Sequence, residues 1–209
     1  EQSALVAGKD FTSSWNPGKD SGHPADNCDV AAADQWTNQG CSQRGPNGSM
    51  GVHFNAGGGG TFAAEWEPSI VDAATADKTP ATFGRIRTWF WPAGMEPEDV
   101  RARAPEPRSW GVPYSYFRLD PDSCPATHFK NMRLVFDLTF CGDLGASSFA
   151  AECPDEAASS SCDTFVERRP ERMREAYWSI RALNVYSRWR GRPAPHRSGG
   201  DSGVDSILT

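Results

Sequence analysis

The chain has 209 residues, 38% of them hydrophobic, with 20 Gly, 16 Pro and 8 Trp. This length suits a single domain, and many turn formers without a long apolar i, i+3, i+4 repeat favour an all-β fold. The formal net charge of −6 disfavours nucleic acid as a partner, because basic residues gather only between Arg168 and Arg197, a stretch we interpret as a solvated face and a tail. The apolar runs are too short to span a membrane, so we expect no membrane partner.

The cysteines predict disulfides and an oxidising compartment, because their number is even and no Cys-x-x-Cys pair occurs. By order and proximity we expect the pairs Cys28–Cys41, Cys124–Cys141 and Cys153–Cys162, although the sequence leaves other pairings open. The four histidines are far apart in sequence, so we expect no metal and no cofactor. We also expect a secreted protein whose leader lies upstream, since no apolar core follows the opening Glu1-Gln2-Ser3.

In chain order, residues 1–48 predict a loop-rich segment, residues 49–190 a β-sandwich and residues 191–209 a disordered tail. Period-two patterning predicts antiparallel strands in two packed sheets. These strands are Gly51–Asn55, Thr61–Trp66, Arg85–Trp91, Leu134–Phe140 and Ile180–Tyr186. Variable or Pro-rich connections are expected at residues 67–83 and 92–113. Short helical stretches are expected at residues 163–169, capped by Asp163, and at residues 171–178.

The predicted strand Arg85–Trp91 has two different faces. Ile86, Thr88 and Phe90 share one face, and Arg85, Arg87, Trp89 and Trp91 share the other. We expect Trp89 and Trp91 to lie in a core rather than in a ligand cleft.

Several segments between about Asn27 and Trp189, in this order and spacing, resemble fungal endo-1,3(4)-β-glucanases of glycoside hydrolase family 16, which are laminarinase-like enzymes. They are Gly51-Val52-His53-Phe54-Asn55, Phe62-Ala63-Ala64-Glu65-Trp66, Ile86-Arg87-Thr88-Trp89-Phe90-Trp91-Pro92, Pro97-Glu98-Asp99-Val100, Trp110-Gly111-Val112-Pro113, Cys124 with His128-Phe129, Leu138-Thr139-Phe140-Cys141-Gly142-Asp143, Cys153-Pro154 with Cys162, and Ala176-Tyr177-Trp178-Ser179-Ile180. The resemblance implies a concanavalin-like jelly roll, an antiparallel β-sandwich with a sugar-binding cleft. It also implies hydrolysis of β-1,3 or mixed β-glucans with retention.

Retention needs two carboxylates about 5–5.5 Å apart, one as nucleophile and one as acid. The family places them on one strand as Glu-x-Asp-x-x-Glu, and no glutamate of this sequence begins that spacing. Glu65 and Glu67 share one strand face, but the family does not use that position for chemistry. We therefore assign no catalytic residue, expect the chain alone to be inactive, and expect the motif to lie before Glu1, which would leave the sandwich incomplete at its N-terminus.

Three residues are candidate β-glucan contacts. Asp143 follows Cys141-Gly142 and could accept hydrogen bonds from sugar hydroxyls, or it could only hold the turn. Leu144 stands where the family usually has a Trp that stacks on glucose, so stacking is lost there. Trp110 precedes Gly111-x-Pro113 and is also typical of a packing residue.

Three interpretations remain open. The chain is the C-terminal part of a glucanase whose N-terminal half is missing or supplied as a partner, a non-catalytic β-glucan-binding or structural β-sandwich, or a secreted disulfide protein unrelated to glycans. An incomplete sandwich would leave apolar residues such as Ile86, Phe90, Leu134 and Phe136 poorly covered.

Overall fold

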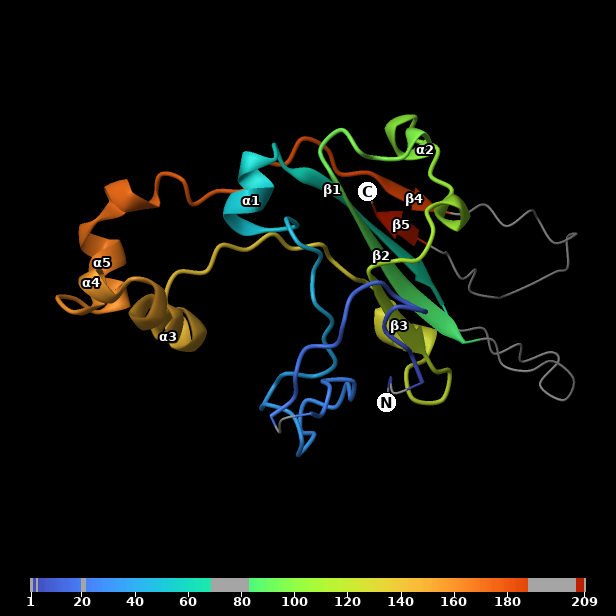
Figure 1. Ribbon diagram of the computed structural model, residues 1–209, viewed down its shortest axis with the longest axis horizontal. Coiled ribbons are helices and arrows are strands. Elements are labelled where there is room, and N and C mark those ends of the chain that lie inside the picture. The colour runs from blue at the N-terminus through green and yellow to red at the C-terminus, as the bar shows by residue number, and fades with distance from the viewer. Residues whose placement is uncertain (1, 3, 20–21, 69–82, 188–205, 209) are drawn as a thin grey trace, which may run out of the picture. The chain divides into compact units, whose positions relative to one another are not determined.

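The computed structural model describes residues 2, 4–19, 22–68, 83–187 and 206–208 (Figure 1). The chain divides into two compact units, the first made of residues 1–130 and 182–209 and the second of residues 131–181. The first unit contains α1 (Gly51–Ala56), β1 (Gly60–Glu67), β2 (Gly84–Pro92), α2 (Glu98–Arg101), η1 (Pro107–Ser109), β3 (Ser115–Leu119), η2 (Ala126–Phe129), β4 (Val185–Ser187) and β5 (Ser206–Leu208). The second contains α3 (Gly142–Glu152), α4 (Pro154–Ala157), α5 (Cys162–Arg168) and η3 (Pro170–Met173).

The first unit is built on an antiparallel sheet with the strand order β3-β2-β1-β5-β4. Strands β1 and β2 pair along their full length, from Gly60 opposite Pro92 to Glu67 opposite Arg85. This confirms the predicted strands Thr61–Trp66 and Arg85–Trp91 and their antiparallel pairing. The described residues form one sheet, so the second sheet of a sandwich stays a prediction.

One face of this sheet is aromatic. The rings of Phe62 and Phe90 lie 4.8 Å apart on neighbouring strands, and Phe54 of α1 lies 6.2 and 6.1 Å from them. Farther along β1, the ring of Trp66 lies 5.8 Å from that of Phe129. Alternation along β1 and β2 therefore places these apolar rings opposite the charged residues of the same strands.

The predicted strand Gly51–Asn55 is wrong, because these residues form the helix α1. Gly51 has φ +69°, a left-handed conformation that does not occur in a regular β-strand and that glycine adopts easily. Val52, expected on the same strand face as Phe54, is 81% exposed. The ring of Phe54 packs on Phe62 and Phe90 of the sheet, so a pair of apolar residues two apart was too short a signal to exclude a helical turn.

The described part of residues 1–48 has turns and isolated bridges but no helix or strand. Buried side-chain amides take the place of regular pairing there. The Gln35 amide accepts from the Asn27 N–H at 2.9 Å and donates to the carbonyls of Asn27 and Gly40 at 2.7 and 2.9 Å. The predicted disulfide Cys28–Cys41 is confirmed, and Gln35 lies within the loop that it closes.

In the second unit, the predicted strand Leu134–Phe140 is wrong, because the segment is neither strand nor helix. Asp137 instead bonds locally, accepting from the Leu138 N–H at 2.8 Å and the Thr139 hydroxyl at 2.9 Å. A strand needs a neighbouring edge for its backbone groups, and the described residues of this unit supply none. Leu134 and Phe136 are 51% and 45% exposed, whereas Ile86 and Phe90, for which the same lack of cover was expected, are half-buried.

The helices of the second unit correct two predicted disulfides. Cys141 pairs with Cys162, and Cys124 and Cys153 are free, so Cys124–Cys141 and Cys153–Cys162 are wrong. Cys141 directly precedes α3 and Cys162 begins α5, and these helices contact each other through Phe149 and Phe165, whose rings lie 5.3 Å apart. The bond therefore joins the beginnings of two packed helices, and proximity in sequence was the wrong guide.

The C-terminal predictions are partly confirmed. The helix predicted at residues 163–169 is α5, but its N-cap is Ser161 rather than Asp163, accepting from the Thr164 N–H at 3.3 Å. The helical turn predicted at residues 171–178 is only η3, and the strand predicted at Ile180–Tyr186 is reduced to β4. Within the predicted tail, Ser206–Leu208 form β5 and pair with β1 and β4, while residues 191–205 and 209 lie outside the described residues.

Candidate functional site

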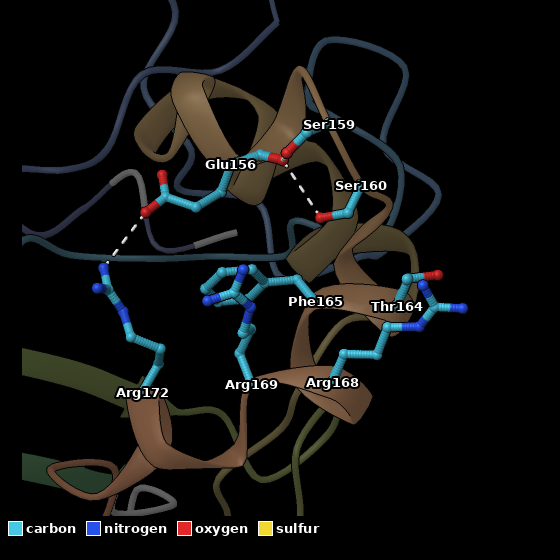
Figure 2. Close-up of a pocket in the computed structure, with 8 residues that line it drawn as sticks. All are labelled: Glu156, Ser159, Ser160, Thr164, Phe165, Arg168, Arg169 and Arg172. Carbon is cyan, nitrogen blue, oxygen red and sulfur yellow. Dashed lines mark hydrogen bonds and ion pairs between the residues drawn. The ribbon is translucent and has the colours of Figure 1, made fainter.

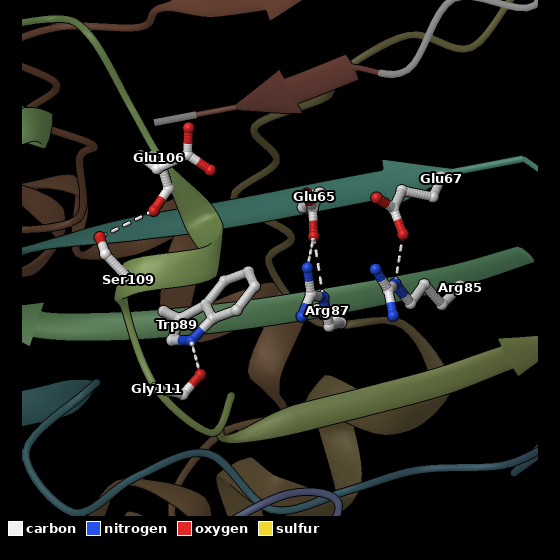
Figure 3. Close-up of polar contacts among 8 residues, drawn as sticks. All are labelled: Glu65, Glu67, Arg85, Arg87, Trp89, Glu106, Ser109 and Gly111. Atoms are coloured by element: carbon white, nitrogen blue, oxygen red, sulfur yellow. Dashed lines mark hydrogen bonds and ion pairs between the residues drawn. The ribbon is translucent and has the colours of Figure 1, made fainter. Parts of the chain in front are cut away.

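The face of the sheet opposite the aromatic rings is charged, and its carboxylates are held by arginines (Figure 3). The register of β1 and β2 sets Glu65 opposite Arg87 and Glu67 opposite Arg85. Arg87 donates from Nε to Glu65 Oε2 at 2.8 Å and also contacts it through Nη2. Arg85 forms an ion pair with Glu67 through Nε.

The Glu65–Arg87 pair is buried, with side-chain exposures of 1% for Glu65 and 15% for Arg87. A nucleophile or acid must reach the bond that it cleaves, and a carboxylate covered in this way cannot. Glu65 is therefore a structural group that ties β1 to β2. The Arg85 guanidinium is partly buried, which lowers its pKa, but Glu67, Glu65 and Tyr116 together outweigh the burial and raise the pKa of Arg85.

Tryptophans continue this charged face. The Trp89 side chain is only 3% exposed, and its Nε1 donates to the Gly111 carbonyl at 3.2 Å. The Trp110 ring lies 5.1 Å from both Trp89 and Trp91, edge to face with each, and its Nε1 donates to Asp99 at 2.7 Å. Trp89 is a core residue, as expected, and Trp110 is a half-buried member of the same cluster.

A hollow of about 370 Å³ lies beside this cluster in the first unit. Arg85, Arg87, Arg108 and Tyr116 are among its lining residues. The Arg87 guanidinium also lies over the Trp89 ring, 5.1 Å from its centre, a cation–π contact. Guanidinium groups can donate hydrogen bonds to the hydroxyl groups of a sugar, and aromatic rings beside them can pack on its apolar faces.

In the second unit, the sequence-predicted contacts Asp143 and Leu144 are neighbours in the first turn of α3. Asp143 is exposed, and the side chain of Leu144 lies outside the described residues. Trp110 belongs to the first unit. Glucan binding by Asp143, Leu144 and Trp110 therefore stays a prediction.

A second hollow, of about 380 Å³, lies within the second unit, and sequence reasoning missed it (Figure 2). Arg168, Arg169 and Arg172 line it, and Arg172 forms an ion pair with Glu156 at 3.3 Å. The arginines come from the end of α5 and from η3, so the turn at Pro170 brings them together. The only sequence signal was the basic cluster, interpreted as a solvated face, and all three arginines are indeed exposed.

Comparison with known proteins identifies the family of the chain. A family model described as the XgeA-like, catalytic GH16 domain matches residues 8–186. The chain belongs to glycoside hydrolase family 16. Sequence similarity extends to fungal members of this family.

A probable endo-1,3(4)-beta-glucanase of Aspergillus fumigatus is 31% identical over 181 residues, which cover 78% of this chain and 25% of that protein. An endo-1,3(4)-beta-glucanase of Arthroderma benhamiae is 31% identical over 175 residues, covering 82% and 35%. A probable glycosidase of Schizosaccharomyces pombe is 36% identical over 166 residues, covering 77% and 34%. The family 16 chain described here thus spans about a quarter to a third of the length of these relatives.

The described parts of this family 16 chain contain no group of three or more His, Cys, Asp or Glu side chains that could hold a metal ion. No helix among them is both long and apolar enough to cross a membrane.

Proposed function

We propose that this chain is part of a secreted, retaining β-1,3(4)-glucan hydrolase and that it does not supply the catalytic carboxylates itself. The observation that carries this proposal is the family 16 match over residues 8–186, combined with a sequence in which no glutamate begins Glu-x-Asp-x-x-Glu. Relatives named as endo-1,3(4)-beta-glucanases support β-glucan as the substrate. Two disulfides support an oxidising, extracellular location.

The paired acids of the sheet support the inactive state of the chain alone. Glu65 and Glu67 are the carboxylates that share one face of β1, and each is bound to an arginine of β2. Releasing Glu65 for catalysis would leave the Arg87 charge buried without its partner. The nucleophile and the acid of the proposed reaction therefore come from residues outside this sequence.

The proposed role of this chain is to build part of the jelly-roll sandwich and of its glucan cleft. Its antiparallel sheet is proposed as one layer of that sandwich. Trp110, Asp143 and Leu144 are the proposed glucan contacts.

Hydrolysis and binding assays separate this proposal from its alternatives. The pure 209-residue chain should release no reducing sugar from laminarin or barley β-glucan. Release that is abolished by Glu98→Gln, or by a change of another of its own acids, would overturn the proposal. A Glu-x-Asp-x-x-Glu strand encoded upstream in the same reading frame supports the enzyme, and its absence from the gene supports a non-catalytic glucan-binding sandwich.

Co-sedimentation with insoluble β-1,3-glucan tests the cleft residues. Trp110→Ala and Asp143→Asn should each reduce the bound fraction, whereas Trp36→Ala, which changes a tryptophan that is 58% exposed, should leave it unchanged. Equal binding by all three variants would remove Trp110 and Asp143 from the proposed site. Near-ultraviolet circular dichroism of Trp110→Ala separates lost binding from lost packing around Trp89.

A further inference from the structure

The triplet Asn47-Gly48-Ser49 has the Asn-x-Ser/Thr form recognised by the enzyme that transfers oligosaccharides to asparagine. The chain has seven asparagines, and the other six lack Ser or Thr two residues later. The middle residue is Gly, and recognition is blocked only when this residue is Pro. The sequence therefore offers one acceptor.

The structure presents the acceptor side chain to solvent at the tip of a turn. The Ser49 N–H donates to the Pro46 carbonyl at 3.1 Å, which closes a four-residue turn around Asn47 and Gly48. Gly48 has φ +76°, as in a type II turn, where the third residue is usually glycine. Asn47 is thus the second residue of the turn, and its side chain is exposed, so a bulky glycan there has room to extend.

Ser49, by contrast, is only 5% exposed. Its hydroxyl lies so close to the Gly45 backbone that a Cβ on Gly45 would meet it at 2.9 Å. The transferase must contact this hydroxyl while it binds the acceptor, so the folded turn hides part of the recognition element. Transfer to Asn47 therefore has to precede folding of this segment, whereas the finished glycan is compatible with the folded turn.

We propose that Asn47 is an N-glycosylation site, modified during secretion and before residues 41–49 fold. In the reaction, the Asn47 amide nitrogen bonds to the anomeric carbon of a lipid-pyrophosphate-linked oligosaccharide. The bond between that carbon and the pyrophosphate oxygen breaks, and the lipid pyrophosphate leaves with the amide proton. The proposal rests on the secreted location in the proposed function, but its readout is mass and does not depend on glucan hydrolysis.

The test is expression of the full 209-residue chain behind a secretory leader in yeast. The peptide that contains Asn47 is then analysed by mass spectrometry before and after peptide-N-glycosidase F digestion in H₂¹⁸O. The heavy oxygen is needed because Asn47-Gly48 is also prone to spontaneous deamidation, which gives aspartate without a glycan. Glycosylation predicts a glycan-sized loss of mass and an ¹⁸O-labelled aspartate at position 47.

Variants make the assignment specific. Asn47→Gln and Ser49→Ala should each abolish the shift, while Asn55→Gln, which removes an asparagine outside any acceptor triplet, should retain it. A chain that is oxidised at Cys28–Cys41, and so has entered the oxidising lumen, but carries an unmodified Asn47 overturns the proposal.

A second experiment tests the order of events. The folded, unglycosylated chain and the same chain reduced and denatured are offered to purified oligosaccharyltransferase with its lipid-linked donor. The unfolded chain should be the better acceptor, and equal transfer to the folded chain would overturn the requirement that modification precede folding.

Discussion

The side-chain amide of Gln43 pairs with the backbone of Tyr116 as a neighbouring strand would. Gln43 Nε2 donates to the Tyr116 carbonyl at 3.0 Å, and the Tyr116 N–H donates to Gln43 Oε1 at 2.8 Å. Gln2 makes the same pair of bonds with Arg118, at 2.9 and 2.8 Å. These residues are two apart on β3, on the edge that faces away from β2, so two glutamines cap an edge that would otherwise be open to other strands.

Gln43→Ala is expected to open this edge. The substitution leaves the Tyr116 N–H and carbonyl without protein partners and removes the acceptor of the Ser115 hydroxyl, 2.7 Å away. We expect a loss of about 1–3 kcal/mol in the free energy of unfolding and faster hydrogen exchange at the Tyr116 amide. Gln39→Ala is the matched control, because the Gln39 amide bonds to Pro17 and Trp36 and not to the sheet. Unchanged exchange at Tyr116 in Gln43→Ala would contradict the capping role.

Glu65→Gln is expected to destabilise the sheet far more than Glu67→Gln. Glu65 is buried against Arg87, so Glu65→Gln leaves the Arg87 guanidinium buried without its counter-charge. We expect this to lower the free energy of unfolding by about 3–5 kcal/mol. The Glu67–Arg85 pair is more open, with side-chain exposures of 18% and 36%, and its loss should cost about 0–1 kcal/mol. Urea unfolding of the two variants gives the comparison, and equal losses would show that Glu65 is not the buried anchor described here.

In the first unit, the strand pair β1 and β2 was predictable from sequence, because these strands carry long alternating patterns that match their two faces. Leu134–Phe140 carries an equally clear alternation and is not a strand, since the pattern records which side chains are apolar and not whether an edge is available. The glutamine caps at β3 were invisible for a related reason. A side-chain amide that replaces a strand depends on residues 73 and 116 positions apart in the chain, and no local pattern reports such a separation.

Peptide mapping under non-reducing conditions should find Cys28 linked to Cys41 and Cys141 linked to Cys162, with Cys124 and Cys153 as thiols. The disulfide Cys141–Cys162 links α3 and α5 and restricts the unfolded chain. Cys162→Ser should therefore destabilise the second unit by about 2–4 kcal/mol. Cys153→Ser should have little effect and is the control. A linked peptide that joins Cys153 to Cys162 would contradict the pairing.

Thr61→Val should raise the pKa of Glu96. Partial burial pushes this pKa upward, but hydrogen bonds from the Glu96 and Gly94 backbone and from Thr61, with the charge of Arg101, lower it below the ordinary value of 4.5. The Thr61 hydroxyl donates to Glu96 Oε1 at 2.8 Å, and valine keeps the shape of the side chain without the donor.

The lowered pKa fixes how stability should depend on pH. A carboxylate whose folded pKa is depressed adds stability above its unfolded pKa, and this contribution is lost as the pH falls through the folded pKa. Thr61→Val should therefore cost about 1 kcal/mol at pH 7, and the difference from the unsubstituted chain should shrink as the pH falls below 4.5. Thr139→Val is the control, because it removes a hydroxyl bonded to the Asp137 carboxylate and leaves Glu96 untouched. Nuclear magnetic resonance titration of Glu96 decides the matter, since an unchanged midpoint in Thr61→Val would mean that the Thr61 hydrogen bond does not favour the ionised carboxylate.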